Sequence, residues 1–172
     1  RYLGTGGLGY YHLSDTYIAL FSHFIPCGVY EAVYILDGLL KNQSDIQPDT
    51  IHGDTQSQSE AVFGLAYLLG IKLMPRIRGI KHLKLYRTSK EDHFKHIDTL
   101  FKDTIKWELI ESCLPDMLRI ALSVKAGRIN ASTILRRLGT YSRKNKLYLA
   151  LRELGRVVRT VFLLQYIAEA EI

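Results

Sequence analysis

The chain has 172 residues, of which 47% are hydrophobic and 23% charged, as is typical of a globular protein that can bury a core. The net charge of +6 favours a polyanionic partner, and with no long apolar run and no signal peptide we expect a cytoplasmic protein without a membrane partner. The two cysteines, Cys27 and Cys113, have no metal-ligand spacing and are predicted to be reduced thiols in the core.

The first predicted elements are a hairpin and a helix. Residues 9–26 are rich in aromatic and β-branched types, and the turn-forming residues 14–16 divide them into two runs, which predicts two antiparallel strands. Residues 28–42 carry apolar side chains at helical spacing, which predicts a buried helix with these residues on one face: Val29, Val33, Leu36 and Leu40.

A short strand, a helix and a second strand are predicted next. Thr50 and Ile51 favour a strand, Gly53 allows a sharp exit, and Asp54 follows at the carboxyl end. A helix follows, with Ser57 or Ser59 as its cap and four residues on its buried face: Val62, Leu65, Ala66 and Leu69. Residues 71–79 predict a second strand, ended by Pro75. Open α/β sheets keep ligand crevices at the carboxyl ends of their strands, so Asp54 is either a site residue or a turn cap.

From about residue 88 onward the apolar period is helical. We expect one or two helices over residues 104–126, broken or kinked at Pro115, and a short helix capped by Asn130 or Ser132 and closed by Gly139. A long helix follows from about residue 145. The chain is therefore predicted to divide into residues 1–88, a mixed sheet with helices, and residues 89–172, purely helical. It starts at Arg1 and ends without a helix stop signal, so we expect a piece of a longer protein.

Positive charge is concentrated in two regions. Residues 71–90 contain seven Lys and Arg and no acid, and residues 117–168 contain eleven against the single acid Glu153. A solvated helix face normally mixes both signs, whereas segregated positive charge suits a phosphate backbone. Binding to DNA and a solvated basic surface are about equally compatible with this pattern.

Three other features are set aside. The glycine-rich stretch GTGGLG (residues 4–9) follows no strand and opens no helix, so it does not predict dinucleotide binding. His93 and His96 could share a helix face, but nothing supplies further metal ligands, and a solvated face is the better interpretation. Aromatic side chains are expected in the core rather than stacked on bases: Tyr10, Tyr11, Tyr17, Tyr30, Tyr34 and Trp107.

Three stretches resemble a known family: residues 4–27, residues 34–86, which include HGDTQSQSEAVFGLAYLLGIKLMPRIR, and residues 123–167, which include ALRELGRVVRT. In this order, over essentially the whole chain, they are similar to the catalytic region of the Tn-three-type transposases of replicative unit transposons. The resemblance implies a mixed α/β fold: a partial RNase H-like core (1–88) followed by an all-helical insertion (89–172). It also implies a DDE triad of carboxylates that bind divalent metal, Mg²⁺ or Mn²⁺.

Asp54 matches the second Asp of that triad. The first Asp of the family lies upstream of Arg1 and the Glu lies beyond Ile172, while Asp15 and Glu153 match typical positions outside the triad. Residues 55–59, TQSQS, depart from the family's usual pattern, in which glycine and threonine follow the Asp. Phosphoryl transfer uses two hard cations roughly 3.5–4 Å apart, and carboxylates suit them as ligands. Because two of the three triad carboxylates are expected outside this chain, we expect the 172-residue chain to be inactive on its own.

The resemblance further implies DNA as the partner, both transposon ends and target, and a homo-oligomeric full-length protein. Eight arginines are the expected phosphate contacts: Arg76, Arg78, Arg128, Arg136, Arg137, Arg152, Arg156 and Arg159. The expected function is metal-dependent strand cleavage and strand transfer in replicative transposition. The alternatives are a non-catalytic basic DNA-binding or scaffolding domain on an RNase H-like fold, and an unrelated α/β protein in which Asp54 only caps a turn.

Overall fold

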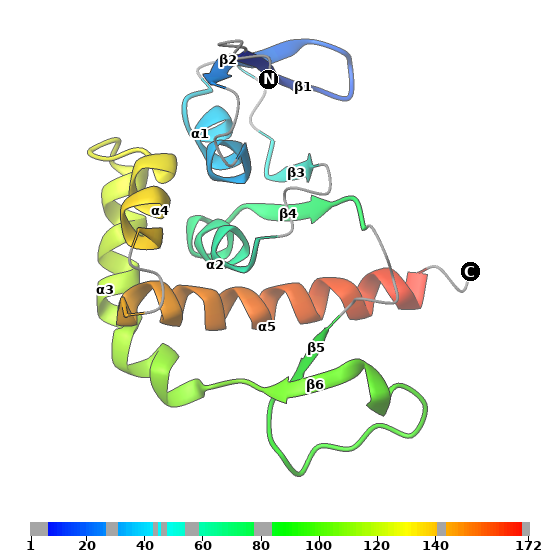
Figure 1. The fold of residues 1–172 in the computed structure, drawn as a ribbon. Helices are drawn as coiled ribbons and strands as arrows, with labels where there is room; N and C mark the ends of the chain where they lie inside the picture. Colours follow the sequence, from blue (N-terminus) through cyan, green and yellow to red (C-terminus); the bar gives the residue numbers. More distant parts are fainter. Residues whose placement is uncertain are drawn as a thin grey trace, which may run out of the picture.

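The structure is a computed structural model that describes residues 7–26, 31–42, 45, 48–53, 59–77, 84–140 and 144–169 (Figure 1). It begins with the predicted antiparallel hairpin, β1 (Gly7–Leu13) paired with β2 (Ala19–Pro26). The Ser14 hydroxyl accepts a hydrogen bond from the Ile18 N–H at 3.0 Å and closes the turn. The hairpin is therefore confirmed.

The expectation that the aromatic residues lie in the core is wrong for three of them. The exposed fractions are 64% for Tyr11, 87% for Tyr17 and 39% for Trp107. Tyr17 lies in the hairpin turn and has a positive φ of 61°, so its side chain projects away from the strands. Tyr34 packs against the core as expected, and Tyr30 lies outside the described residues.

The helix predicted over residues 28–42 is described from residue 31 onward and ends at Leu40. It consists of a 3₁₀ turn, η1 (Glu31–Tyr34), followed by α1 (Ile35–Leu40). Val33 and Leu36 are buried as predicted, whereas Leu40 lies at the exposed end and Val29 lies outside the described residues. Of the described residues of the predicted apolar face, Val33 and Leu36 therefore reach the core and Leu40 does not.

The next unit contains β3 (Thr50–Gly53), α2 (Glu60–Leu69) and β4 (Lys72–Pro75). The two strands pair in parallel, with Thr50 opposite Lys72 and Gly53 opposite Pro75, and the strand ends at Pro75 as predicted. All four residues predicted for the buried face of α2 are at most 5% exposed: Val62, Leu65, Ala66 and Leu69. Gly70, at a φ of 77°, ends the helix in the left-handed conformation that glycine adopts without a steric cost.

The expectation that everything after residue 88 is helical is wrong, because a loop and a strand occupy much of residues 88–104. β5 (Leu85–Arg87) pairs in parallel with β6 (Phe101–Thr104), which follows the 3₁₀ turn η4 (Asp98–Leu100). The Arg87 guanidinium holds the intervening loop by donating to the carbonyls of Asp92, Asp98 and Phe101. His93 and His96 lie in this loop and not on a helix.

The remaining described residues form three helices. These are α3 (Trp107–Lys125), which continues through Pro115 as one helix, α4 (Ala131–Gly139) and α5 (Lys146–Glu169). In the part of the chain that the structure describes, no strand follows Thr104. The boundary near residue 88 between two domains stays a prediction.

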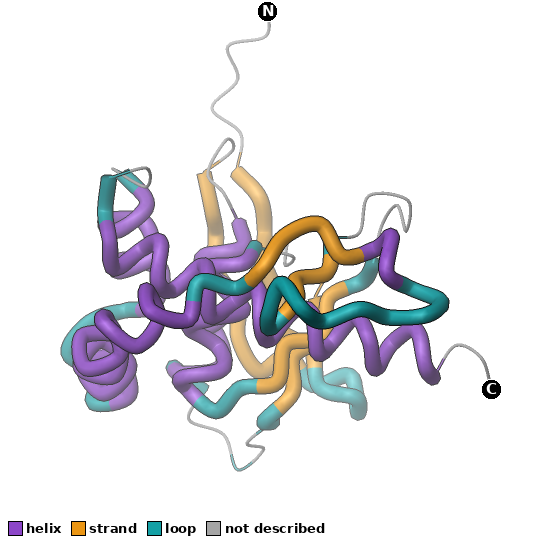
Figure 2. Tube along the Cα trace, turned by 90° about the horizontal axis from the view of Figure 1, so that it is seen from below, coloured by secondary structure: helices purple, strands orange, loops and turns teal. Residues whose placement is uncertain are grey.

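Helix α5 is the element around which the core is arranged. It passes between the layer of α2 and β4 on one side and β5 and β6 on the other, and α3 crosses its start (Figure 1). In the view from below, the strands overlap near the middle (Figure 2), but the three two-stranded sheets lie at separate levels of the molecule (Figure 1). Leu151 and Leu163 of α5 join Leu36, Phe63 and Met117 in one buried cluster. The fold is therefore mixed α/β with small sheets. None of the described helices is both long and apolar enough to cross a membrane.

Candidate active site

The carboxyl ends of β3 and β4 lie at the same edge because the two strands are parallel. The Arg76 N–H, directly after β4, donates to the Gly53 carbonyl at 2.8 Å. The backbone of Arg76 is thereby fixed next to the residue that precedes Asp54. Asp54 and Arg78 themselves lie outside the described residues. The strand edge predicted for Asp54 is present up to Gly53.

The structure tests one of the two caps predicted for the start of α2. Ser59 is the N-cap residue, but its side chain makes no capping hydrogen bond, and Ser57 lies outside the described residues. Glu60 occupies the first turn instead, where a negative charge is favoured by the helix dipole. Its side chain contacts residues of α5 and β5.

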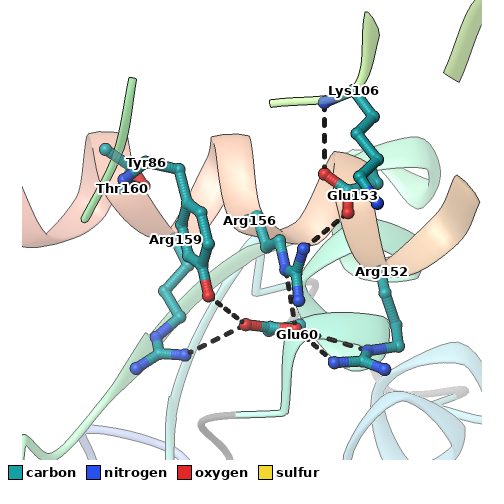
Figure 3. A network of polar contacts seen from close by, with 8 residues as sticks. All are labelled: Glu60, Tyr86, Lys106, Arg152, Glu153, Arg156, Arg159 and Thr160. Atoms are coloured by element: carbon teal, nitrogen blue, oxygen red, sulfur yellow. Dashed lines mark hydrogen bonds and ion pairs between the residues drawn. The ribbon is translucent and has the colours of Figure 1, made fainter. Parts of the chain in front are cut away.

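Glu60 is the centre of a polar cluster that links α2, α5 and β5 (Figure 3). Its Oε2 accepts hydrogen bonds from Arg152 Nη2 at 3.0 Å and from Arg156 Nε at 3.1 Å. Its Oε1 accepts one from the Tyr86 hydroxyl at 3.0 Å and lies 3.7 Å from Arg159 Nη1. We call these five residues the Glu60 cluster.

Two further contacts extend the cluster to the start of α3. Glu153, whose side chain is only 6% exposed, pairs with Arg156, and its Oε2 accepts a hydrogen bond from the Lys106 N–H at 3.3 Å (Figure 3). The Arg156 guanidinium also lies 4.8 Å from the centre of the Tyr86 ring, within cation–π range. Buried charges of both signs are therefore paired and hydrogen-bonded here, as burial requires.

The pKa values in the cluster follow from this pairing. Burial raises the pKa of the Glu60 carboxyl, but the charge of Arg156 opposes it. Hydrogen bonds from Arg152, Tyr86 and Arg156 act in the same sense as that charge, so the Glu60 pKa lies below its ordinary value. Burial, and then the Glu60 charge, raise the pKa of the Tyr86 hydroxyl. Burial lowers the pKa of Arg156, but the charges of Glu60, Tyr86 and Glu153 and the hydrogen bond to Glu60 together raise it above its ordinary value. Glu60 is therefore ionised at neutral pH.

Three of the arginines expected to bind DNA thus have a protein carboxylate as partner. Their side chains are 36% (Arg152), 19% (Arg156) and 16% (Arg159) exposed. The surplus of positive charge on α5 that indicated DNA binding is partly balanced by Glu60, which lies far away in the sequence. Sequence reasoning missed Glu60. The available signal was the acid Glu60 at the first position of one helix, together with a second helix that carries arginines at i, i+4 and i+7.

The other described arginines that were expected to contact phosphates lie on the surface. Arg128, Arg136 and Arg137 are exposed, and Arg136 Nη1 donates a hydrogen bond to the Tyr34 hydroxyl at 3.3 Å. A surface pocket beside them is lined by Thr133, Arg136, Arg137, Gly139 and Thr140. This side of α4 therefore presents two guanidinium groups to solvent.

The start of α4 is capped from another helix. Neither Asn130 nor Ser132 makes the predicted side-chain cap. Asp37 of α1, which is 5% exposed, accepts a hydrogen bond from the Ser132 N–H at 3.1 Å and another from the Ser132 hydroxyl. A carboxylate from α1 therefore satisfies an N–H group that the first turn of α4 leaves free.

We expect Asp37→Ala to lower the free energy of unfolding by about 2–3 kcal/mol, because it removes two hydrogen bonds to a buried charge and leaves the donors of Ser132 unsatisfied. Urea unfolding of the 172-residue chain measures this loss. The matched control is Asp116→Ala, which removes an exposed carboxylate on α3. It should change the free energy of unfolding by less than about 0.5 kcal/mol, and an equal loss in both variants would contradict the capping role.

The described residues do not complete a metal site. Among them, no three His, Cys, Asp or Glu side chains are gathered so that they could hold a metal ion. Mg²⁺ prefers carboxylate oxygens as ligands, and Asp54, the predicted ligand, lies outside the described residues.

Comparison with known proteins defines the class. The family model described as the Tn3 transposase DDE domain matches residues 1–172. The transposase for transposon Tn501 of Pseudomonas aeruginosa is 38% identical over 167 residues (97% of this chain), and that for transposon Tn1546 of Enterococcus faecium is 35% identical over 166 residues (96%). The transposase for transposon gamma-delta of Escherichia coli is 33% identical over 173 residues (99% of this chain).

The chain therefore belongs to the Tn3 transposase DDE domain family. It spans 17% of the length of each of these three relatives.

Proposed function

We propose that this chain is the part of a Tn3-family transposase that supplies Asp54 to a metal-dependent active site for DNA strand cleavage and strand transfer in replicative transposition. The observation that carries the proposal is the edge formed by the parallel strands β3 and β4, which the hydrogen bond between Arg76 and Gly53 fixes. The family match covers residues 1–172 of this chain. Residues 1–88 correspond in this proposal to part of an RNase H-like core and residues 89–172 to an insertion that is helical from Trp107 onward.

Asp54 would be a ligand to a divalent cation, Mg²⁺ or Mn²⁺, with the first Asp and the Glu of the triad supplied from outside this chain. Such ions, when bound, activate the attacking oxygen and stabilise the leaving oxygen of the phosphodiester. The contribution of this chain is to hold one carboxylate at a rigid strand end. Rigid placement matters because a misplaced catalytic group loses much of its effect.

DNA is the proposed partner, both as transposon ends and as target. The exposed side of α4 supports this, because Arg136 and Arg137 line a surface pocket, and none of the described residues that line it is acidic. Arg76, Arg78 and Arg128 are further proposed phosphate contacts. Arg152, Arg156 and Arg159 would contact DNA only with the guanidinium hydrogens that Glu60 leaves unused. A homo-oligomer of the full-length protein remains part of the proposal.

The catalytic proposal is tested in the full-length transposase with Asp54 replaced by Asn, with DNA cleavage and DNA binding measured side by side. Loss of cleavage with retained binding supports a catalytic role. Wild-type cleavage would leave the basic DNA-binding domain as the alternative.

Reversing the charge of Arg136 and Arg137 to Glu should weaken DNA binding about tenfold or more at 0.1 M salt for every sequence tested, because phosphate contacts carry no base specificity. A salt titration of the dissociation constant measures this, and the slope should become shallower. The matched control reverses two exposed basic residues of α3, Arg119 and Lys125. Binding that does not change between low and physiological salt would exclude this mode.

A further inference from the structure

The Glu60 cluster joins the start of α2 to the middle of α5. We infer that Glu60 is a positioning residue: its pairing with the α5 arginines fixes where α2 begins, and thereby holds one end of the connection that carries Asp54, while the pairing of β3 with β4 holds the other end. This inference rests on the proposed catalytic role of Asp54. It concerns the described residues on either side of the connection, Gly53 and Ser59, and the elements that hold them.

The first end is held by the small parallel sheet. β3 pairs with β4 along its whole length, and the last pair is Gly53 opposite Pro75. The Arg76 N–H continues this ladder by donating to the Gly53 carbonyl at 2.8 Å. The chain therefore leaves β3 from a fixed point.

The second end is held by α5. The Glu60 carboxylate, whose side chain is 14% exposed, accepts hydrogen bonds from Arg152 and Arg156 at 3.0–3.1 Å. The backbones of the two helices also touch at this crossing: a Cβ built on Gly155 would lie 1.6 Å from the Glu60 carbonyl oxygen, and one on Gly64 would lie 2.2 Å from the Leu151 carbonyl oxygen. Glu60 thus contacts α5 through both its side chain and its backbone.

A carboxylate is required at this position because its partners are all donors. Arg152, Arg156 and Arg159 carry three positive charges, and the Tyr86 hydroxyl donates as well. Gln has nearly the same size, but it carries no charge and turns one acceptor into a donor group. With Gln at residue 60, the half-buried arginines lose their shared counter-charge, and the side-chain link between the start of α2 and α5 is weakened while the backbone contact remains.

The test uses full-length transposase carrying Glu60→Gln. We expect DNA binding within about threefold of wild type and single-turnover cleavage of transposon ends lowered about 10- to 100-fold, with a higher Mg²⁺ concentration needed for half-maximal cleavage. In the metal-free protein, amides of the first hydrogen-bonded turn of α2, residues 63–66, should exchange with deuterium faster than in wild type. The Mg²⁺ dependence and the local exchange report on placement, which a general loss of stability would not move selectively.

The matched control is Asp116→Asn, the same change of carboxylate to amide in an exposed ion pair with Arg119. It should leave cleavage, the Mg²⁺ dependence and exchange as in wild type. Wild-type cleavage and exchange in a folded Glu60→Gln protein would overturn the inference. Asp54→Asn, measured in parallel, separates the two claims: if it cleaves normally the proposed function fails, and if it is inactive while Glu60→Gln is normal only the positioning role fails.

A milder variant decides the case if Glu60→Gln does not fold. Tyr86→Phe removes one hydrogen bond to Glu60 Oε1 and keeps the ring that lies against Arg156. We expect a smaller fall in cleavage, about two- to fivefold, with DNA binding unchanged and the Mg²⁺ requirement raised. Cleavage equal to wild type at all Mg²⁺ concentrations would overturn the inference.

Discussion

Full-length transposase with Asp54→Asn is expected to lose strand cleavage and strand transfer by on the order of a thousandfold, while it folds and binds DNA nearly as well as wild type. The amide keeps the size of the side chain but loses the negative charge that a divalent cation requires. A metal ligand acts on the transition state, whereas phosphate contacts hold the substrate, so the effect falls on the cleavage rate and not on affinity. Single-turnover cleavage and a binding titration on the same DNA measure the two quantities.

The control for this variant lies at the other end of the same strand. Asp49 is an exposed carboxylate directly before β3, where its side chain accepts a hydrogen bond from Thr50. Asp49→Asn makes the identical chemical change away from the carboxyl edge and should cleave as wild type. Near wild-type cleavage by Asp54→Asn would contradict the catalytic role.

Gly155→Ala is expected to lower the free energy of unfolding by at least about 3 kcal/mol, even though Ala is the better helix former. The added Cβ would lie 1.6 Å from the Glu60 carbonyl oxygen and 3.0 Å from the Gly64 nitrogen. Both are backbone atoms of α2 and cannot rotate away, so the two helices must separate along their shared buried face. Urea unfolding of the 172-residue chain measures the loss.

Gly139→Ala is the matched control for this prediction. At Gly139, in the last position of α4, the nearest described atoms to a Cβ would be those of the Tyr148 side chain, at 3.7–3.9 Å, which is an ordinary contact. This substitution should be neutral or stabilising by up to about 1 kcal/mol. Equal stabilities of the Gly155→Ala and wild-type proteins would show that α2 and α5 do not approach as closely as described.

The elements with strong local signals were predictable from the sequence. The α2 face of Val62, Leu65, Ala66 and Leu69 has a clear helical period, and each of these side chains is buried. The hairpin and the ends of β3 and β4 follow from turn residues, Gly53 and Pro75. In each case the deciding information lies within a few neighbouring residues.

The missed features depend on contacts between distant segments. β5 and β6 have only three and four residues, which is too short for a periodic pattern to predict them. Arg87 holds the loop between them through a contact that the sequence does not indicate. Likewise, Asp37 caps α4 from a different helix. Local residues cannot indicate a partner that the tertiary fold supplies.

The candidate site shows the same division. The position of Asp54 after a short strand was predicted, and the structure places Gly53 at the end of that strand. The basic character of α5 was also evident, but its arginines were assigned to DNA alone. Their pairing with Glu60 follows only from the crossing of α2 and α5, which the two glycines permit.

The measurement that tests the central claim most directly is cleavage of transposon ends by full-length Asp54→Cys transposase in Mg²⁺ and in Mn²⁺. A thiolate binds Mg²⁺ poorly and accepts softer ions. If Asp54 is a metal ligand, the variant should be inactive in Mg²⁺ and regain part of its cleavage in Mn²⁺, whereas wild type should be active in both. A variant that cleaves equally well with either ion, at the wild-type rate, would contradict the assignment of Asp54 as a metal ligand.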